Sequence, residues 1–257
     1  MTISEPAPKP CSIRWVEETD STQNEILKHI DEYDNMSVVA ARYQTSGRGQ
    51  RGNSWHSERG LNMTFSMLLR FGDDGLQPLR ALDQFGITRA MTLAVCDYLE
   101  GEGINCMIKW PNDIYARNRK ICGMLIENIL EGEYVSHSIA GIGLNVNQKD
   151  FPGQLLNPTS MALQTGKDYS LENGLEKLCS SIVSCLRKGY YMPGSEAKAL
   201  YLDRLYRLGR FEDYARCPGG EVFNARIVGV SDEGKLIVEN RKGELEKFAF
   251  KEISYII

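Results

Sequence analysis

Apolar side chains recur at helical spacing soon after the start of the chain. Ile26, Leu27 and Ile30 fall on one face of a helix that would follow Asp20, and we expect them to be buried. Asp20 is a favourable N-cap residue, and Gln23 completes the pattern of a capping box. The pattern therefore predicts a short helix that begins near Asp20, with both of these polar side chains stabilising its first turn.

Two longer stretches show the same period. The segment 78–99 is typical of a long amphipathic helix, and 158–209 is also helical in pattern, most clearly at 171–191. The expected core positions of the first helix are Leu82, Phe85, Ile87, Ala90, Leu93 and Ala94.

Elsewhere in the first two thirds of the chain the pattern is that of strands. The stretches between the predicted helices are short, and the later ones are rich in β-branched residues and glycine, as is typical of adjacent strands that line a site. These predicted strand regions are 37–44, 61–70, 104–116, 120–130 and 136–147.

The tail of the chain changes pattern again. Residues 213–257 alternate apolar and polar positions in short runs, with turn residues at Asp232–Gly234 and Lys242–Gly243. We therefore expect a flexible leader at 1–12, a catalytic domain at 13–210 and a small barrel-like β domain at 213–257. The expected fold class is α/β (α+β), with a mixed, largely antiparallel sheet flanked by helices.

Composition and charge exclude several classes of protein. The 257 residues are 42% hydrophobic and 25% charged with a net charge of −4, which is ordinary for a globular protein and gives no global attraction to DNA or membranes. The seven cysteines are scattered without a C-x-x-C pair, which argues against a disulfide framework or a zinc site. No signal peptide is visible at the start of the sequence, and no apolar run approaches the ~18 residues that a membrane span needs. We expect a cytoplasmic protein.

The glycines of the stretch "GRGQRGNSW" are spaced as G-x-G-x-x-G, at Gly47, Gly49 and Gly52. A dinucleotide site needs a helix directly after this turn, and the residues that follow have no helical periodicity. A better interpretation is a mobile loop that closes over a ligand, with fixed charge from Arg48 and Arg51 and a flat apolar face from Trp55. The alternative is a solvated arginine turn with one core tryptophan.

Four motifs occur in order along the chain: "DST" at 20–22, "GRGQRGNSW" at 47–55, "KWPND" with "KICGMLIE" at 109–127, and "GIGLNVN" at 141–147. Together they make the chain resemble the biotin–protein ligases (biotin–[acetyl-CoA-carboxylase] ligases) over residues 14–257. The resemblance implies two steps. The carboxylate of biotin attacks the α-phosphate of ATP to give biotinyl-5′-AMP and pyrophosphate. A lysine of a biotin carboxyl carrier domain then attacks the mixed anhydride, and AMP leaves.

The resemblance also implies where biotin binds. Ser21 and Thr22 would hydrogen-bond the ureido ring, although both residue types also cap helices, and Gln44 matches another ureido contact. Gly47 belongs to the same site. Gly123 and Gly143 would let the backbone approach the ligand closely.

Charged residues are expected at the other end of the ligand. By resemblance, Lys120 bridges the biotin carboxylate and the α-phosphate, and Arg48 meets the carboxylate or the phosphate. Lys109 would be a supporting cation on the phosphate side. Asn112 and Asp113 would hold Mg²⁺ and the triphosphate, with Asp113 as the metal ligand.

The adenylate is expected to contact the remaining motif residues. Asn145 resembles the asparagine that contacts adenine, Trp55 would cover the ring, and Arg51 would meet the phosphates. Many family members have arginine where this chain has Gln50, so the loop should hold the phosphate end less tightly. Trp110 and its neighbouring proline are expected to be structural.

Two alternatives remain open at this stage. A lipoate–protein ligase or octanoyltransferase shares the fold and the transfer to a carrier lysine, and a non-catalytic biotin-binding module would share the pocket. Some biotin–protein ligases carry an N-terminal DNA-binding domain and act as repressors. Because about 12 residues precede the first motif region here, we expect no such domain and no DNA partner.

Overall fold

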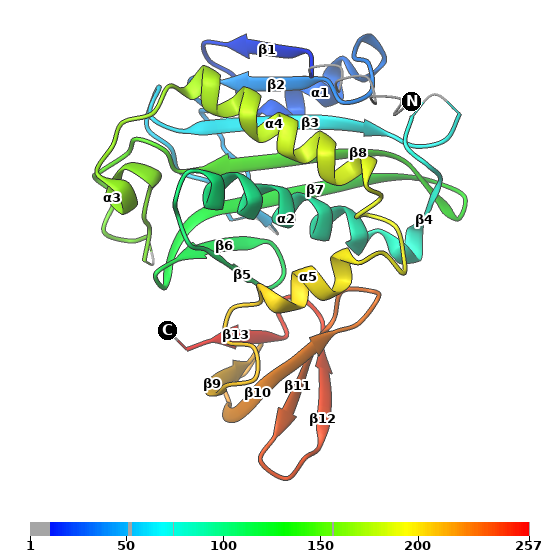
Figure 1. The fold of residues 1–257 in the computed structure, drawn as a ribbon, viewed down its shortest axis with the longest axis vertical. Helices are drawn as coiled ribbons and strands as arrows, with labels where there is room; N and C mark the ends of the chain where they lie inside the picture. The colour runs from blue at the N-terminus through cyan, green and yellow to red at the C-terminus, as the bar shows by residue number, and fades with distance from the viewer. Residues whose placement is uncertain (1–10, 51–52, 74, 156, 257) are drawn as a thin grey trace, which may run out of the picture.

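The computed structural model describes residues 11–50, 53–73, 75–155 and 157–256. These residues form two β-sheets, a large one followed along the chain by a small one, with helices between and around them (Figure 1). The predicted leader at 1–12 lies almost wholly outside the described residues.

The large sheet has eight strands in the order β1-β2-β3-β8-β7-β6-β5, and β4 pairs with β8 off this path. β1 and β2 are parallel, and every other pair in the sheet is antiparallel. The predicted mixed, largely antiparallel sheet is confirmed. The strands are β1 (Ile13–Val16), β2 (Val38–Ala41), β3 (Met63–Arg70), β4 (Leu79–Arg80), β5 (Met107–Lys109), β6 (Asp113–Ala116), β7 (Arg119–Glu131) and β8 (Tyr134–Leu144).

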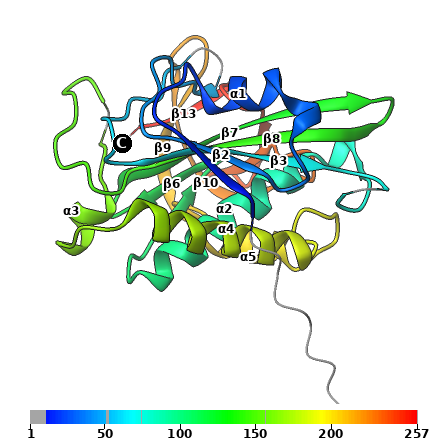
Figure 2. The same ribbon diagram turned by 90° about the horizontal axis from the view of Figure 1, so that it is seen from above.

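Helices cover the two faces of this sheet unequally. α2 (Phe85–Gly101) and α4 (Leu171–Arg187) lie on one face, over the main hydrophobic core, whereas α1 (Thr22–Lys28) lies on the other (Figure 2). On the α1 side, Ile26 packs into a small separate cluster with Val39, Leu68 and Ile139. The pocket described below also lies on this face of the sheet. The remaining helical segments are η1 (Ile30–Glu32), η3 (Ala81–Asp83), α3 (Met161–Thr165) and α5 (Ala197–Asp203).

The small sheet is antiparallel throughout, with the order β12-β11-β10-β9-β13. Its buried residues, among them Tyr214 and Phe248, belong to the same hydrophobic cluster as the core of the large sheet. The two sheets therefore share a continuous core, and the division into domains at 210–213 stays a prediction. The strands are β9 (Phe211–Arg216), β10 (Val222–Val230), β11 (Leu236–Asn240), β12 (Leu245–Phe248) and β13 (Ile253–Tyr255).

Two helix predictions were wrong in detail. The helix predicted at 78–99 begins only at Phe85, because Leu79 pairs with Val135 of β8 and the chain then turns through η3. Leu82, predicted to be in the core, is 67% exposed as a result.

The predicted capping box at the start of α1 does not form. The helix begins at Thr22 with Ser21 as N-cap, and the side chain of Ser21 makes no capping hydrogen bond. Gln23 instead extends into the sheet and is buried. Leu27, predicted to be buried, is 40% exposed because only the Ile26 side of this short helix faces the sheet.

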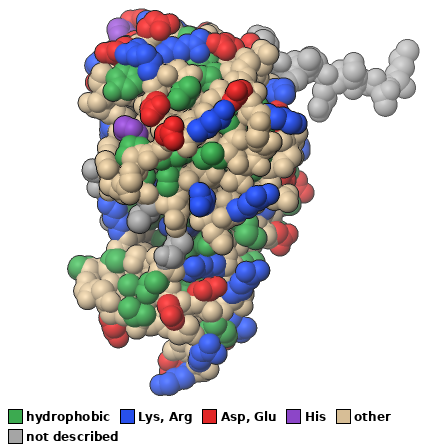
Figure 3. Space-filling view, turned by 90° about the vertical axis from the view of Figure 1, so that its left-hand side faces the viewer, with side chains coloured by type: hydrophobic (Ala, Val, Ile, Leu, Met, Phe, Trp, Pro, Cys, Tyr) green, Lys and Arg blue, Asp and Glu red, His purple; other side chains and the backbone are tan. Residues whose placement is uncertain are grey.

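Charged side chains of both signs lie on the surface, and the cysteines are unpaired. On the face drawn in Figure 3, basic and acidic side chains are interspersed. All seven cysteines are free thiols, and five of them are buried. None of the described helices is both long enough and apolar enough to cross a membrane.

Candidate functional site

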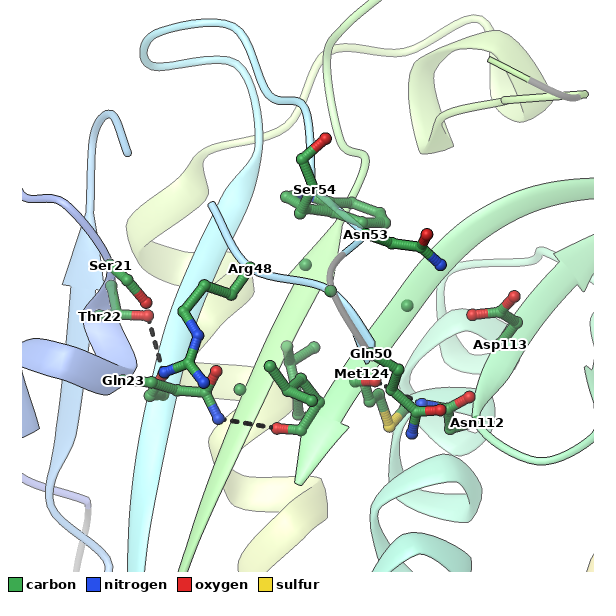
Figure 4. Close-up of a pocket in the computed structure, with 18 of the residues that line it drawn as sticks. Ser21, Thr22, Gln23, Arg48, Gln50, Asn53, Ser54, Asn112, Asp113 and Met124 are labelled. Atoms are coloured by element: carbon green, nitrogen blue, oxygen red, sulfur yellow. Dashed lines mark hydrogen bonds between the residues drawn. The ribbon is translucent and has the colours of Figure 1, made fainter. Parts of the chain in front are cut away.

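A pocket opens on the α1 side of the large sheet and contains about 820 Å³ of empty space, part of it continuous with solvent. Its walls are the start of α1, the glycine loop, strands β3, β7 and β8, and the link between β5 and β6 (Figure 4). Most of the predicted site residues meet here. Those that line the pocket are Ser21, Thr22, Gln44, Arg48, Trp55, Lys109, Asn112, Asp113, Lys120, Gly123 and Gly143.

One end of the pocket is neutral, polar and closely hydrogen-bonded. The carboxamide oxygen Oε1 of Gln44 accepts hydrogen bonds from the backbone N–H of Thr22 at 2.8 Å and from its hydroxyl at 3.1 Å. Thr22 Oγ1 also lies 2.7 Å from the hydroxyl of Ser66 on β3. Thr22 and Ser66 are both buried. The fold thus fixes the orientation of these groups before any ligand arrives.

Gln23 is a pocket residue that the sequence analysis assigned to helix capping. Its side chain is buried, and Nε2 donates to the carbonyl oxygens of Leu125 at 3.1 Å and Ile139 at 3.4 Å. Figure 4 shows it beside Thr22, at the same end of the pocket. The only signal in the sequence that could have placed Gln23 in the pocket is its position directly after the "DST" motif at 20–22.

Gly123 and Gly143 form a floor on which the indole of Trp55 rests. A Cβ atom on Gly143 would lie 2.3 Å from Cε2 of Trp55, and one on Gly123 would lie 3.0 Å from Cζ3. The two glycines are paired across β7 and β8. Glycine at both positions therefore lets a flat group approach the backbone closely, and in this structure that group is Trp55. The predicted approach of the ligand at these glycines stays a prediction.

The other end of the pocket is charged. Nζ of Lys120 lies 2.7 Å from Oδ1 of Asp113, with both side chains partly buried, and 5.7 Å from the ring centroid of Trp55. Nζ of Lys109 lies 4.8 Å from the ring centroid of Tyr255 on β13. Burial lowers the pKa of Lys109 below its ordinary value, partly offset by the charge of Asp113.

The segment between β5 and β6 is held from both sides. The side-chain amide of Asn112 donates to the backbone oxygen of Met124 in β7. Nε1 of Trp110 donates to the backbone oxygen of Gly234 in the small sheet at 2.9 Å, and the Tyr201 hydroxyl of α5 donates to the carbonyl of Pro111. These contacts agree with the structural role expected for Trp110.

The glycine loop is folded back on itself between Arg48 and Ser54, which form an isolated β-bridge. The side chain of Arg48 reaches toward α1 (Figure 4), donates to Oδ1 of Asn24 at 3.1 Å and forms an ion pair with Glu127 of β7. Gly47 does not line the pocket. A Cβ atom there would lie 2.4 Å from the backbone oxygen of Trp55, so the glycine serves the pairing of the loop itself.

One more predicted residue lies outside the pocket. Asn145 is buried beyond the end of β8, where its amide donates to the backbone oxygen of Thr159 at 2.9 Å, and it does not line the pocket. Arg51 lies outside the described residues. The roles predicted for both stay predictions.

The pocket also has residues to which the sequence analysis assigned no role in binding. They are apolar or neutral side chains on strands and loops whose position depends on the register of the sheet, and one comes from the C-terminal tail. The main ones are Asn53, Phe65, Ser66, Met124, Leu125, Ile142 and Phe250. Gln50 lines the pocket on the side of Asn112 (Figure 4).

Comparison with known proteins gives relatives over most of the chain. A bifunctional ligase/repressor BirA of Bacillus subtilis is 32% identical over 80% of this chain, which spans 62% of the length of that protein. A biotin–[acetyl-CoA-carboxylase] ligase of Paracoccus denitrificans is 29% identical over 88% of this chain and 93% of its own length.

A solved structure resembles the whole arrangement. The biotin protein ligase of Aquifex aeolicus in complex with biotin and ATP superposes with a TM-score of 0.73 at 27% identity, covering 95% of this chain and 97% of its own. The model of the biotin/lipoate A/B protein ligase family matches residues 15–145, just over half of the chain and most of the pocket walls. The chain belongs to the biotin/lipoate A/B protein ligase family.

Proposed function

We propose that this chain is an ATP-dependent biotin–protein ligase. It joins the carboxylate of biotin to the α-phosphate of ATP with release of pyrophosphate, and then transfers the biotinyl group to a lysine of a biotin carboxyl carrier domain with release of AMP. The observation that carries the proposal is one pocket with a neutral hydrogen-bonding end, a glycine floor and a two-lysine end. The names of the relatives support the same substrates.

The neutral end fits the ureido ring of biotin. Gln44 uses its oxygen for Thr22, and none of the hydrogen bonds among the described residues uses its Nε2, which is thus available to donate to a ureido carbonyl. Ser21 and Thr22 add hydroxyl groups beside it. A closed network of this kind favours a ligand that satisfies it and disfavours one that leaves buried polar atoms unpaired.

The charged end fits the acid and phosphate groups that react. Attack of one anion on another requires neutralisation of both, and Lys120 lies at the junction of the glycine floor and the charged end. Its partner Asp113 holds the ammonium group in place until a phosphate competes for it. Lys109, Arg48 and Arg51 supply further positive charge, while Trp55 and Asn145 are proposed to contact the adenine ring.

The residues present fit a magnesium ion bound mainly through phosphates. The described residues contain no group of three or more side chains suited to hold a metal. Within the described part of the pocket, we propose Asp113 and the amide oxygen of Asn112 as the protein ligands. Magnesium commonly binds through one or two carboxylates, substrate phosphates and water. When bound, the ion would neutralise phosphate charge.

The small sheet at 213–257 is proposed to support the ATP side. Tyr255 lies over Lys109, and Gly234 holds Trp110 through its backbone oxygen. The catalytic domain at 13–210 would then provide the biotin end, with the carrier lysine approaching from solvent. Because all seven thiols are free and the second substrate is ATP, we assign the reaction to the cytoplasm.

The direct test is biotin-dependent exchange of labelled pyrophosphate into ATP in the presence of Mg²⁺, followed by transfer to a carrier domain. We expect exchange with biotin and none with lipoate or octanoate. Exchange with lipoate instead would retain the family and overturn the substrate. Tight binding of biotin without exchange would identify a non-catalytic biotin-binding module.

A further inference from the structure

A buried amide pair lies outside the pocket, where the chain leaves the glycine loop. Oδ1 of Asn62, directly before β3, accepts from the backbone N–H of Val146 at 2.9 Å, so the amide has one permitted orientation. Its Nδ2 then donates to Oγ of Ser57 at 3.0 Å and to Oε1 of Gln148 at 2.5 Å. With 1% of its surface exposed, Asn62 cannot exchange these partners for bulk water.

The side chain of Gln148 completes the network. Its Nε2 donates to the backbone oxygen of Asp150 at 2.8 Å, so Oε1 faces the other way. That oxygen accepts from Asn62 and from the backbone N–H of Glu58 at 3.2 Å. Gln148 has no exposed surface. Because a satisfied buried network holds its members in one arrangement, the chain at 57–58 is fixed to the segment that follows β8.

The position of Trp55 depends on this attachment. Among the described residues between Gly47 and Trp55, the backbone hydrogen bonds join the loop to itself, as in the bond from N of Trp55 to O of Gly47 at 2.9 Å. Ser57 follows Trp55 by two residues, so a shift of Ser57 would move the indole. Val146 directly follows Asn145, so the same network joins Trp55 to the segment that bears the second residue proposed to contact adenine.

We propose that Asn62 and Gln148 are positioning residues, which act through Ser57 and Glu58 to hold Trp55 against the adenylate and so retain this intermediate until transfer. Neither amide lines the pocket, and neither belongs to the biotin end. The inference rests on the proposed function and adds the groups that set how long the adenylate stays bound.

The expected effect is selective. Loss of the Asn62 amide leaves Gln148 and Ser57 without a buried partner and frees the chain at 57–58, so biotinyl-5′-AMP should dissociate about 10-fold faster. Ser57→Ala removes one bond of the network and should accelerate dissociation about 3-fold. Biotin affinity should stay within about 2-fold of wild type, because the bonds between Gln44 and Thr22 hold the other end of the loop.

The experiment follows the release of labelled biotinyl-5′-AMP after a chase with excess unlabelled compound, in wild type, Ser57→Ala, Asn62→Leu and the double variant. Titration calorimetry with biotin gives the second constant. If Ser57 acts through Asn62, the double variant should release the adenylate no faster than Asn62→Leu. Ser136→Ala is the matched control, because its hydroxyl donates to the backbone oxygen of Ile129 at 3.1 Å, outside the pocket, and it should behave as wild type.

Release rates equal to wild type in Ser57→Ala and Asn62→Leu would overturn the proposal. So would biotin affinity that falls in parallel with adenylate retention, since a general loss of structure weakens both. If thermal unfolding shows that Asn62→Leu does not fold, Ser57→Ala decides the question alone, because it removes a single partly exposed hydroxyl. A wild-type protein that binds neither biotin nor biotinyl-5′-AMP would instead overturn the proposed function.

Discussion

The two ends of the pocket differ in how their polar groups are paired: neutral groups form a hydrogen-bond network at one end, and charged groups form an ion pair at the other. At the neutral end, Thr22 hydrogen-bonds both Gln44 and Ser66, and Thr22 and Ser66 are buried, so the fold completes this end without a ligand. At the charged end, Lys120 is paired with Asp113. Arg48, whose side chain reaches toward α1, is paired with Glu127, and we expect both cations to change partners when their anions bind.

The comparison separates binding from catalysis. A preassembled neutral end contributes the same interactions before and during reaction, so we expect it to set the affinity for the acid. Cations that change partners contribute most where negative charge develops or must be brought together, so we expect them to set the rate. Variants at the two ends should therefore change different kinetic constants, and the predictions below test this in order of decreasing effect.

The largest effect is expected for Lys120→Met. Removal of the ammonium group should reduce the rate of adenylate formation by about 10³-fold, because two anions then approach without compensation. Biotin affinity should change far less. Single-turnover formation of the adenylate and calorimetric binding of biotin measure the two constants separately. Lys149→Met, at an exposed lysine paired with Asp168, is the matched control and should behave as wild type.

Thr22→Val should show the reverse pattern. The variant keeps the shape of the side chain but loses the hydroxyl that connects Gln44 and Ser66, so biotin should bind about 100-fold more weakly while kcat changes little. Steady-state exchange over a range of biotin concentrations separates KM from kcat.

Thr88→Val, on α2 and outside the pocket, controls for the substitution itself. A large loss of kcat in Thr22→Val with unchanged KM would mean that the neutral end takes part in the chemical step.

Gly143→Ala tests the floor that joins the two ends. The new methyl group must displace the indole of Trp55, and we expect about a 10-fold loss in kcat/KM for ATP together with a change in tryptophan fluorescence. Gly229→Ala is the matched control, because a Cβ there meets only Ile237 at 3.8 Å. Unchanged fluorescence in Gly143→Ala would show that the indole does not rest on this floor in solution.

The smallest effect concerns the pH dependence of stability. Burial lowers the pKa of Lys109 in the folded protein, so between that pKa and the ordinary value of 10.5 the folded state binds fewer protons than the unfolded state. The free energy of unfolding should therefore rise with pH across this window. Urea unfolding of wild type and Lys109→Met at several alkaline pH values isolates the contribution. A difference in the free energy of unfolding between the two proteins that stays constant across these pH values would contradict this prediction.

The sequence predicted the elements and most of the site because both depend on local pattern. Strands β2, β3, β7 and β8 follow stretches of apolar and β-branched residues, and the motif residues lie where these strands and their loops meet. Helix boundaries were less predictable. Leu82 has helical spacing, but the adjacent pairing of β4 with β8 takes its segment out of the helix.

What the sequence could not provide were contacts between distant segments. Gln23 fits a capping box by spacing, and only the register of β7 and β8, which brings Leu125 and Ile139 within reach, places its amide in the pocket. The pairing of Arg48 with Glu127 joins residues 79 positions apart. The contribution of the tail through Phe250 likewise depends on how the two sheets pack.

The two hairpin tips of the small sheet differ in how they could be used by a protein engineer. The tip around Gly234 is packed against Phe85 of α2, and its backbone holds Trp110, whereas a Cβ at Gly243 in the next hairpin would meet nothing within 4 Å. An epitope tag or a new pair of chain ends should therefore be accommodated at 241–243. The same insertion at 232–234 would disconnect the tail from the segment that bears Asn112.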